Sequence, residues 1–457
     1  MSGEVAKNNP IVSVWNAVYE TRPDRQGVHM KWVSRFIILF ILILPLKAEA
    51  ENPIKKGERL DIQRCVELAI KNHPNIKAAQ NTIRVNESRI GQAKSNYYPQ
   101  LNWQTGYSRI APAISGTTRS SVNSDYDQYA SNLNLTQNIY DFEKTATQVQ
   151  IQNLNTESSR QDLDTTEAQI VLGVKQAYYS LVQAQKNREV ARESVKQFQS
   201  HLEQAKGFFE VGVKPKFDVT KAEVDLSNAK LNLIKAENAF RIARVNLNNA
   251  IGVPDAPEFS LDNNLLFEKY DVDLQEALKK AYDTRPDLRS LMTKVEAGSQ
   301  SMELAKKGYY PYVTGNASWG YNGQDFPPDK SWNVGAMLNI PIFSGFMTKS
   351  QVAEAKATLD VLKANEQSMR LQIRLEVEQA YSNLLEATDG IATAQLTVRQ
   401  AEENVDLANG RYASGVGNPI EVTDALVALS NARTTHIAAL TGYKTAQASL
   451  EKAMGVK

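Results

Sequence analysis

The sequence predicts a mainly α-helical protein with a membrane β-barrel part, built from two copies of one large unit. Three observations lead to this prediction. Residues 142–209 form one long helical pattern without proline. The order of motifs in the first half of the chain returns in the second half. Two segments in each half alternate between apolar and polar residues, which is the pattern of a strand with one apolar face.

The long helical pattern has a seven-residue rhythm. One line of the rhythm contains Val174, Leu181, Val195 and Leu202, and a second line contains Ala177, Ala184, Ala191, Phe198 and Ala205. This spacing places two rows of small or apolar side chains on one seam of a helix. At 1.5 Å per residue such a helix is about 100 Å long. Because the rest of its surface is mostly polar, we expect it to pack against other helices of similar length.

An internal repeat divides the chain into residues 51–258 and residues 259–457. Tyr97-Tyr98-Pro99 returns as Tyr309-Tyr310-Pro311, 212 positions later (309 − 97). Gly212-Val213 returns as Gly415-Val416, 203 positions later (415 − 212), so a loop of variable length separates the two offsets. Each unit reads as helix, strand, strand, long helix, turn and helix. The expected helices are 61–96, 142–209 and 218–250 in the first unit, and 273–308, 346–412 and 421–454 in the second.

The alternating segments predict strands at about residues 99–111, 127–140, 311–322 and 331–343. Strands of this length with one apolar face suit an outer-membrane barrel, although a water-soluble antiparallel sheet shows the same alternation. Aromatic residues near the strand ends favour the barrel. We expect five of them to lie at the membrane interface: Trp103, Tyr107, Trp319, Tyr321 and Trp332.

Four strands are too few to close a barrel. Open strand edges are not tolerated in lipid, because each unpaired backbone group costs several kcal/mol there. Bacterial barrels have at least about eight strands, so several copies of the chain must combine their strands. Strand counting alone permits a dimer, a trimer or a tetramer.

The N-terminus predicts a secretory signal peptide within residues 1–50. Basic residues precede an apolar stretch from Phe36 to Leu46, and Ala48-Glu49-Ala50 has the small-residue pattern of a signal-peptidase site. The arrangement is complete if translation starts at Met30, which makes residues 1–29 an extension and places cleavage near Ala50. We therefore expect the protein to leave the cytoplasm.

Composition argues against nucleic-acid binding and against catalysis. The 52 basic and 51 acidic residues balance, so no basic excess attracts nucleic acid. The single cysteine, Cys65, lies in an apolar helical pattern, which favours a buried thiol. The four histidines lie in no nucleophile or metal motif: His29, His73, His201 and His436. We expect no catalytic residue, no metal and no cofactor.

The turns after the two long helices carry matching helix-ending residues. Gly212 and Gly415 stand where a long helix must end, and glycine accepts the left-handed conformation of a helix C-cap. A proline follows each of them within four residues and bars the helix from continuing. Asp218 and Glu421 then open the next helix, where the helix dipole favours a carboxylate.

Taken together and in this order, these motifs resemble the TolC family of outer-membrane efflux proteins over residues 55–457. The resemblance rests on the duplicated order, the two Tyr-Tyr-Pro motifs, the two turns, and Pro341-Ile342-Phe343-Ser344-Gly345 after the last strand. It implies a homotrimer in the outer-membrane lipid, with a 12-stranded barrel (four strands from each of three copies) and a helical tunnel across the periplasm. It also implies a periplasmic adaptor and an inner-membrane pump or ABC exporter as partners.

The resemblance assigns roles to residues at the turns. Five positions correspond to the tips that contact the adaptor: Gly212, Val219, Gly415, Val422 and Ala425. Glu421 and Asp424 lie three residues apart on one helix face and correspond to acids that narrow the periplasmic entrance. Helix capping plus a surface acid is the simpler interpretation of this pair. Because Lys221 stands at the position equivalent to Asp424, we interpret one half as the mobile constriction and the other as its brace.

The sequence therefore predicts an exit channel for efflux or type I secretion, gated by constriction at the helix tips. An alternative is a non-conducting trimeric coiled coil that spans the periplasm. That protein needs neither alternating strands nor a second copy of the tip turn. A periplasmic adaptor needs only one helical hairpin. The exported substrate is not encoded in any recognisable motif.

Overall fold

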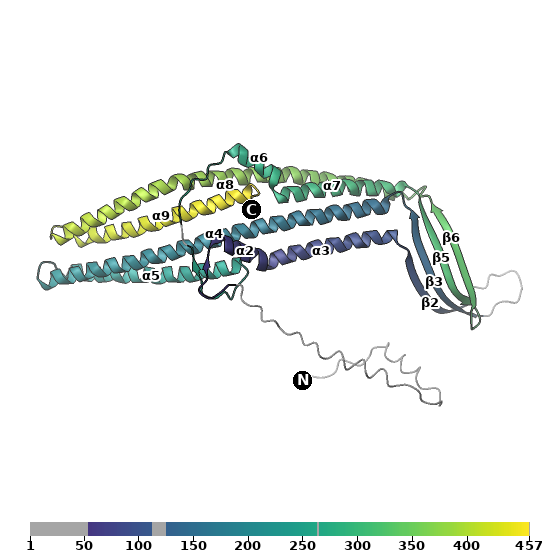
Figure 1. Ribbon diagram of the computed structural model, residues 1–457, viewed down its shortest axis with the longest axis horizontal. Helices are drawn as coiled ribbons and strands as arrows, with labels where there is room; N and C mark the ends of the chain where they lie inside the picture. Colours follow the sequence, from purple (N-terminus) through teal and green to yellow (C-terminus); the bar gives the residue numbers. More distant parts are fainter. Residues whose placement is uncertain (1–53, 112–124, 263–264, 457) are drawn as a thin grey trace, which may run out of the picture. The chain divides into compact units, whose positions relative to one another are not determined.

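A computed structural model describes residues 54–111, 125–262 and 265–456 (Figure 1). All of them belong to one compact unit, Asn52–Lys457. The predicted signal peptide lies outside the described residues. The unit is mostly helical with one larger sheet, which confirms the predicted mainly α-helical fold, while closure of the sheet into a membrane barrel stays a prediction. Within the described ranges, we find no helix with the length and the apolar character that crossing a membrane requires.

The helices occur twice, with equal lengths in the two halves. The lengths are 11, 21, 67 and 35 residues in each half. This agreement supports the duplication. The helices of the first half are α2 (Ile62–Asn72), α3 (Pro74–Lys94), α4 (Lys144–Glu210) and α5 (Lys216–Ala250), and those of the second half are α6 (Leu274–Thr284), α7 (Pro286–Lys306), α8 (Met347–Ala413) and α9 (Pro419–Ala453).

The prediction of one continuous helix over 61–96, and of another over 273–308, is wrong. Each is broken after one short helix, at Pro74 and at Pro286. A proline has no backbone N–H, and its ring clashes with the carbonyl one turn before it, so it begins a new helix rather than continuing the old one. His73 caps the new helix in the first half, because its Nδ1 accepts a hydrogen bond from the Asn75 backbone N–H (3.2 Å).

Two glycines let the chain pass close to these breaks. Gly252 and Gly455 have φ angles of +73° and +72°. A Cβ atom on Gly252 would lie 3.1 Å from His73 Cα, and one on Gly455 would lie 3.0 Å from Arg285 Cα. The two contacts are equivalent, because the repeat offsets relate their residues. Gly455 lies 203 positions after Gly252, and Arg285 lies 212 positions after His73. The duplication therefore extends to individual backbone contacts.

The two long helices organise the packing. α4 contacts α3 and α5 from its own half, and it also contacts α7 and α9 from the second half (Figure 1). α8 is flanked in the same way by α7 and α9. The predicted seam is largely buried: Val174, Leu181, Phe198, Leu202 and Ala205 are core residues. Cys65 is also buried, and burial raises the pKa of its thiol to about 12.

Four antiparallel strands form one sheet in the order β2–β3–β5–β6, so the two halves join between β3 and β5. Their register repeats the duplication. Gln100 on β2 pairs with Thr136 on β3, and the equivalent residues Tyr312 and Asn339 pair between β5 and β6. A second, short parallel pair joins β1 (Arg59–Leu60) to β4 (Ser260–Leu261). The strands of the larger sheet are β2 (Gln100–Ile110), β3 (Tyr126–Tyr140), β5 (Tyr312–Gly323) and β6 (Asp329–Asn339).

Apolar side chains form a row across one face of this sheet. Trp103 pairs with Leu133, Leu133 pairs with Trp319, and Trp319 pairs with Trp332. Directly paired residues project from the same face. The three tryptophans, together with Tyr107 and Tyr321, are all exposed. Their placement at a membrane interface stays a prediction.

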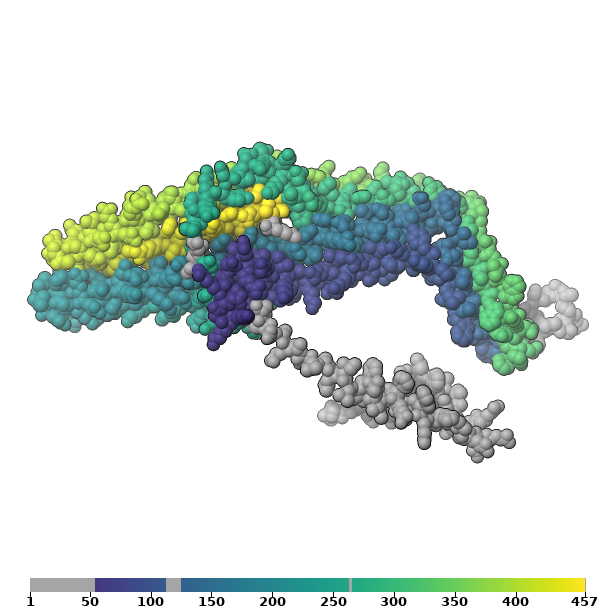
Figure 2. Space-filling view, viewed as in Figure 1, coloured from purple at the N-terminus to yellow at the C-terminus, as the bar shows by residue number. Residues whose placement is uncertain are grey.

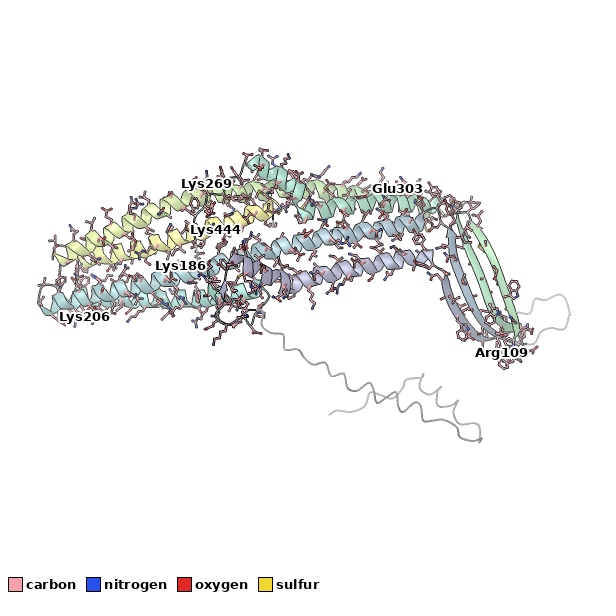
Figure 3. The ribbon with its side chains drawn as sticks, in the orientation of Figure 1. Arg109, Lys186, Lys206, Lys269, Glu303 and Lys444 are labelled. Atoms are coloured by element: carbon pink, nitrogen blue, oxygen red, sulfur yellow. The ribbon has the colours of Figure 1, made fainter. Side chains whose placement is uncertain are left out.

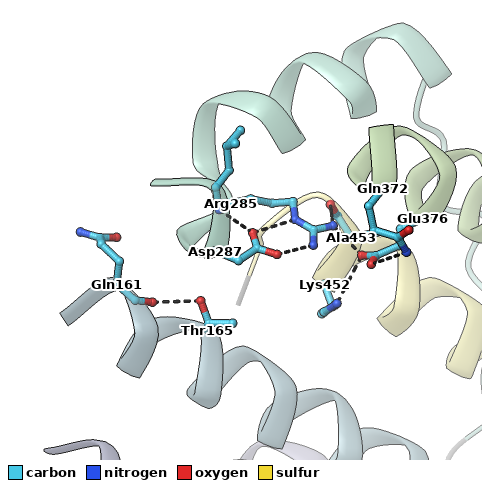
Figure 4. Close-up of polar contacts among 9 residues, drawn as sticks. Gln161, Thr165, Arg285, Asp287, Gln372, Glu376, Lys452 and Ala453 are labelled. Atoms are coloured by element: carbon cyan, nitrogen blue, oxygen red, sulfur yellow. Dashed lines mark hydrogen bonds and ion pairs between the residues drawn. The ribbon is translucent and has the colours of Figure 1, made fainter. Parts of the chain in front are cut away.

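A buried ion-pair network joins α7, α8 and α9 (Figure 4). The Arg285 guanidinium is 3% exposed and contacts Asp287 (2.5 Å) and Glu376 (2.7 Å). It also donates a hydrogen bond to the Ala453 carbonyl (3.3 Å). Burial alone would raise the pKa of both carboxyls, but the hydrogen bonds and charge of Arg285 outweigh it. The pKa values of Asp287 and Glu376 therefore lie below their ordinary values.

We predict that the double variant Asp287→Asn/Glu376→Gln is less stable than the wild type at pH 7 by about 2 kcal/mol. Carboxyls with a lowered folded-state pKa stabilise the fold above their unfolded values, 3.8 and 4.5, and lose that contribution as the pH falls through the folded values. The difference between the two proteins should therefore shrink below about pH 4. Urea unfolding followed by circular dichroism measures it.

Glu303→Gln is the matched control. Glu303 lies on α7 and pairs with Lys306 (2.7 Å), but both side chains are nearly half exposed (Figure 3). Surface pairs of this kind contribute at most about 1 kcal/mol, so the control should be close to wild type at both pH values. An equal loss of stability in the control, or a gap that stays constant at low pH, would contradict the assignment.

Candidate functional site at the helix tips

The two long helices end in turns of equivalent geometry. Gly212 and Gly415 have φ angles of +76° and +81°, the left-handed conformation predicted for them. The Val213 N–H donates to the Phe208 carbonyl (2.9 Å), which satisfies one of the last carbonyls of α4. In the second turn, the Gly417 N–H donates to the Arg411 carbonyl (2.8 Å). These bonds end the helices within one turn.

Gly417 is a turn residue that the matching pattern of Gly212 and Gly415 does not predict. A Cβ atom there would lie 2.7 Å from the Tyr412 backbone nitrogen, which is closer than real Cβ contacts allow. The next residue, Asn418, caps α9 because its Oδ1 accepts a hydrogen bond from the Ile420 N–H (3.0 Å). The Gly-Asn-Pro sequence was the available signal.

The acids that open the second helix of each hairpin make different contacts. Glu421 lies on the surface, and its carboxylate pairs with Arg411 across the turn (3.1 Å). Asp218 is buried instead. Asp424 is exposed and forms no ion pair with any described residue. Of the two acids predicted to line the entrance, Asp424 thus carries the unpaired charge.

A shared apolar core holds the two hairpins together near their tips. Figure 2 shows the α4–α5 hairpin (teal) against the α8–α9 hairpin (yellow-green) in this region. Val422 and Ala425 are fully buried in this core, and Val219 packs against its edge. In this conformation the side chains of Val422 and Ala425 therefore contribute to packing. The turns are more accessible to a partner protein than these two buried residues.

Polar contacts join the two hairpins above that core. The Tyr412 hydroxyl donates to the buried Asp218 carboxylate (3.4 Å). Lys214 Nζ donates hydrogen bonds to the carbonyls of Gly415 (3.2 Å) and Gly417 (3.1 Å). The first turn is therefore hydrogen-bonded to the second. Burial and the neighbouring Asp218 raise the pKa of Tyr412 to about 12, which keeps its hydroxyl a donor.

A second polar link lies about two turns farther from the tips. Asp225 is buried and pairs with Lys221 (2.6 Å) on its own helix. The Thr423 hydroxyl of the other hairpin donates to the same carboxylate (2.8 Å). Lys221 is the residue equivalent to Asp424 in the first half. It neutralises the Asp225 carboxylate, which both hairpins contact.

His201 lies beneath these contacts. Its ring is buried, stands 5.1 Å from the Tyr412 ring, and has no hydrogen-bond partner at either nitrogen among the described residues. Burial lowers the pKa of His201, although Asp225 and Asp218 partly oppose the shift. The neutral ring fits the apolar core. Across the described ranges, no group of three or more His, Cys, Asp or Glu side chains is arranged to hold a metal ion.

Large apolar side chains cover the outside of the turns. Val211, Val213, Phe217 and Val416 are each more than half exposed. The sequence pattern predicts the role of the glycines, but the exposure of these four side chains depends on how the turn folds. Exposed apolar groups gathered at one place on a surface commonly mark a site of protein contact.

Comparison with known proteins identifies the family. The model of the outer membrane efflux protein family matches residues 65–253 and 277–456, one segment in each half of the chain. The outer membrane protein TolC of Vibrio cholerae is 23% identical over 382 residues, covering 80% of this chain and 84% of that protein. The alkaline protease secretion protein AprF of Pseudomonas aeruginosa is 23% identical over 409 residues, covering 85% and 83%.

Solved structures show the same fold. The CmeC outer membrane channel of Campylobacter jejuni superposes with a TM-score of 0.73 at 19% identity, covering 86% of this chain and 85% of that one. The family match spans both halves of the duplicated unit and both tip turns. The chain belongs to the outer membrane efflux protein family and is a protein of the outer membrane.

Proposed function

We propose that this protein is the outer-membrane exit channel of a tripartite efflux pump or a type I secretion system. Three copies form a 12-stranded barrel and a helical tunnel, through which substrate passes without chemical change. A periplasmic adaptor and an inner-membrane pump or ABC exporter deliver the substrate. The tunnel is closed at rest by the hairpin tips, which splay to open it. The secretion role of the relative AprF supports the export direction.

The sheet with two free edges is the observation that carries this proposal. Within the described residues, β2 pairs with β3 alone and β6 pairs with β5 alone. One apolar face and two unpaired edges suit a strand group that closes only with further copies. Each copy then offers its β6 edge to the β2 edge of the next, which closes a ring.

The helices have matching free edges. On α5, Val224, Leu231 and Ile242 are about half exposed, and they recur after seven and eleven residues. On α8, Leu385, Leu396 and Leu407 are similarly exposed and recur after eleven residues. Spacings of seven and eleven return to the same helix face, so each edge presents an apolar stripe. We infer that the α5 edge of one copy packs against the α8 edge of the next.

Charge on these edges supports the same pairing. Three bases on α5 and three acids on α8 form no ion pair within the part of the chain that the structure describes. They are Lys230, Lys235 and Arg241 on α5, and Asp389, Glu403 and Asp406 on α8. Opposite charges on the two edges favour contact between unlike edges over contact between like edges.

We assign the adaptor contact to the turns at Gly212 and Gly415, with Val219 at the margin. The exposed side chains of Val213 and Val416 supply apolar area there. The entrance gate is assigned to the acids of the second hairpin, with Asp424 unpaired and Glu421 held by Arg411. In a trimer each acid forms a ring of three negative charges around the axis.

Single-channel recording in planar bilayers tests conduction and selectivity together. We predict that the wild type conducts and prefers cations, and that Asp424→Ala loses much of this preference. Glu421→Ala should lose less, because Arg411 already compensates that charge.

Glu354→Ala is the control, since Glu354 is an exposed acid on α8 far from the tips along the helix. Its ion preference should equal that of the wild type. A protein that forms no channel contradicts the proposed function. Unchanged preference in Asp424→Ala contradicts the gate assignment alone.

We predict that Tyr412→Phe raises the open probability of the channel. The change removes the hydrogen bond between the hairpins and leaves the buried Asp218 carboxylate without its Tyr412 donor. A hydrogen bond to a charged group contributes about 1.5–3 kcal/mol, which corresponds to a shift of about tenfold or more in the open–closed ratio. Recording of open times at fixed voltage measures the shift.

Tyr443→Phe is the matched control. Tyr443 is equally buried, and its hydroxyl is also hydrogen-bonded, to the Glu268 carbonyl (2.8 Å) and the Tyr270 N–H (2.7 Å), but it lies far along α9 from the tip. It should leave gating unchanged while it destabilises the fold. If both variants open the channel equally, general loosening rather than the tip contact controls gating.

Barrel closure makes a prediction at single-residue level. Leu135 on β3 pairs with Ala317 on β5, where the two halves meet. The repeat offsets carry this pair to Leu338 (135 + 203) on β6 and Thr105 (317 − 212) on β2 of the next copy. We predict that Leu338→Cys/Thr105→Cys forms disulfide-linked dimers and trimers, because directly opposed strand residues have Cβ atoms about 5 Å apart.

The pair Ala336→Cys/Thr105→Cys is shifted by two residues and should link poorly. Cys65 is buried and contributes no link. Non-reducing gel electrophoresis separates the products. Equal linking of both pairs, or preferred linking of the shifted pair, contradicts the register.

A further inference from the structure

A groove lies where the two halves of the chain meet. α2 and α4 of the first half and α9 of the second enclose about 520 Å³, with Val66, Ile70 and Lys444 in its lining. Lys444 is labelled on α9 in Figure 3. Inside the groove, Lys175 Nζ of α4 lies 2.7 Å from Glu451 Oε2 of α9, and both side chains are 20% exposed. This ion pair joins the two halves.

The duplication predicts where a second groove of this kind forms. α8 is the counterpart of α4, α6 is the counterpart of α2, and α5 is the counterpart of α9. In a ring of copies, α8 and α6 of one copy therefore meet α5 of the next in the way that α4 and α2 meet α9 within the chain. The agreement of the strand registers in the two halves supports the use of the same offsets.

Half of this second groove is visible on α5. Lys444, Gln447 and Ala448 line the groove within the chain, and their counterparts are Arg241, Arg244 and Val245 (each minus 203). These three residues line an open hollow of about 610 Å³ on the surface of α5. The counterpart of Lys175 is Glu378 (175 + 203) on α8.

We propose that Glu378 of one copy pairs with Arg241 and Arg244 of the next, in a groove that is complete only between copies. The proposal rests on the trimer of the proposed function and names the charged contact that joins its members. The charges are reversed relative to the groove within the chain. There the long helix supplies the base, whereas between copies the long helix supplies the acid.

The present partners of these side chains leave them free to make this contact. Glu378 pairs with Arg374 (2.8 Å) on an exposed helix face, where such a pair contributes little. Arg244 lies 4.0 Å from Glu258, which is itself largely exposed. Arg241 forms no ion pair with any described residue. Enclosure between copies removes water from the charges and strengthens their attraction, and the arginine fork can bind both carboxylate oxygens.

The reversed charges determine which helices of adjacent copies can pack together. If α5 of one copy took the place of α9 against α4, Asn248 (451 − 203) would replace Glu451, and Arg244 would enter the groove that Lys175 lines. If α9 took the place of α5 against α8, Glu451 would face Glu378. Both exchanges bring like charges together, and such contacts act against wrong partners. The charge pattern thus favours a ring in which first and second halves alternate.

Cross-linking of the full-length protein in detergent tests the contact. Glu378→Cys/Arg244→Cys, treated with a short bismaleimide, should give covalent dimers and trimers on a denaturing gel. The matched control is Glu378→Cys/Gln447→Cys. Gln447 is the counterpart of Arg244 in the second half and lines the groove within the chain. The control and both single variants should give no link between chains.

Native mass spectrometry separates the two ways in which this test can fail. A trimer whose test pair does not link, or whose control pair links equally well, overturns the contact and leaves the proposed function standing. A monomer overturns the trimer itself and the contact with it. Covalent dimers and trimers from the test pair alone support the proposal.

Charge exchange gives a second readout that does not depend on cysteine chemistry. Glu378→Arg should lower the temperature at which the trimer dissociates by about 5 °C, and adding Arg241→Glu/Arg244→Glu to the same chain should restore it. Glu386→Arg, which changes an exposed acid lining a different groove of α8, is the control and should have little effect. Equal loss in Glu378→Arg and the control, or no restoration, overturns the proposal.

Discussion

The pairing of backbone groups at the edges of the sheet is the constraint on which the rest of this structure depends. β2 and β6 each leave one side without a strand partner in the described chain. In water such edges are exposed to solvent, but in lipid each unpaired group costs several kcal/mol. The duplication offers a solution, because the β3–β5 junction already shows how the end of one unit pairs with the start of another. A ring of copies repeats that junction without a new kind of contact.

The same constraint explains why the long helices have incomplete neighbours. α4 is packed on both sides, by α3 and α5 from its own half and by α7 and α9 from the other. Among the described residues, α8 packs against α7 and α9 but lacks the equivalents of the two helices that cover the far side of α4. Leu385 and Leu396 are exposed there for that reason. In the proposed trimer, the neighbouring copy that completes the sheet also covers the exposed face of α8.

Features set by local sequence could be predicted, whereas features set by distant contacts could not. The seam through Val174 and Leu202, the strand faces and the left-handed glycines at 212 and 415 all depend on a few neighbouring residues. Pro74 and Pro286 break the helices, but the apolar pattern continues across them and by itself predicts one helix in each half. The β3–β5 register and the burial of Arg285 depend on residues far apart in the chain, and no local pattern encodes them.

The tip network shows why the two halves differ although they were copied from one unit. Tyr412 and Thr423 reach from the second hairpin to Asp218 and Asp225 of the first, so the first hairpin supplies buried acids that hold the second in place. Lys221 neutralises Asp225, and a lysine at the position equivalent to Asp424 suits that bracing role. The second hairpin keeps its acids at the surface, where they can face a lumen. If the two hairpin tips were identical, the acids of both would be buried and need a partner, or the acids of both would be exposed. In the proposed channel, divergence of a few residues lets the first hairpin hold while the second gates, because hydrogen bonds between the two hairpins can break when one hairpin moves.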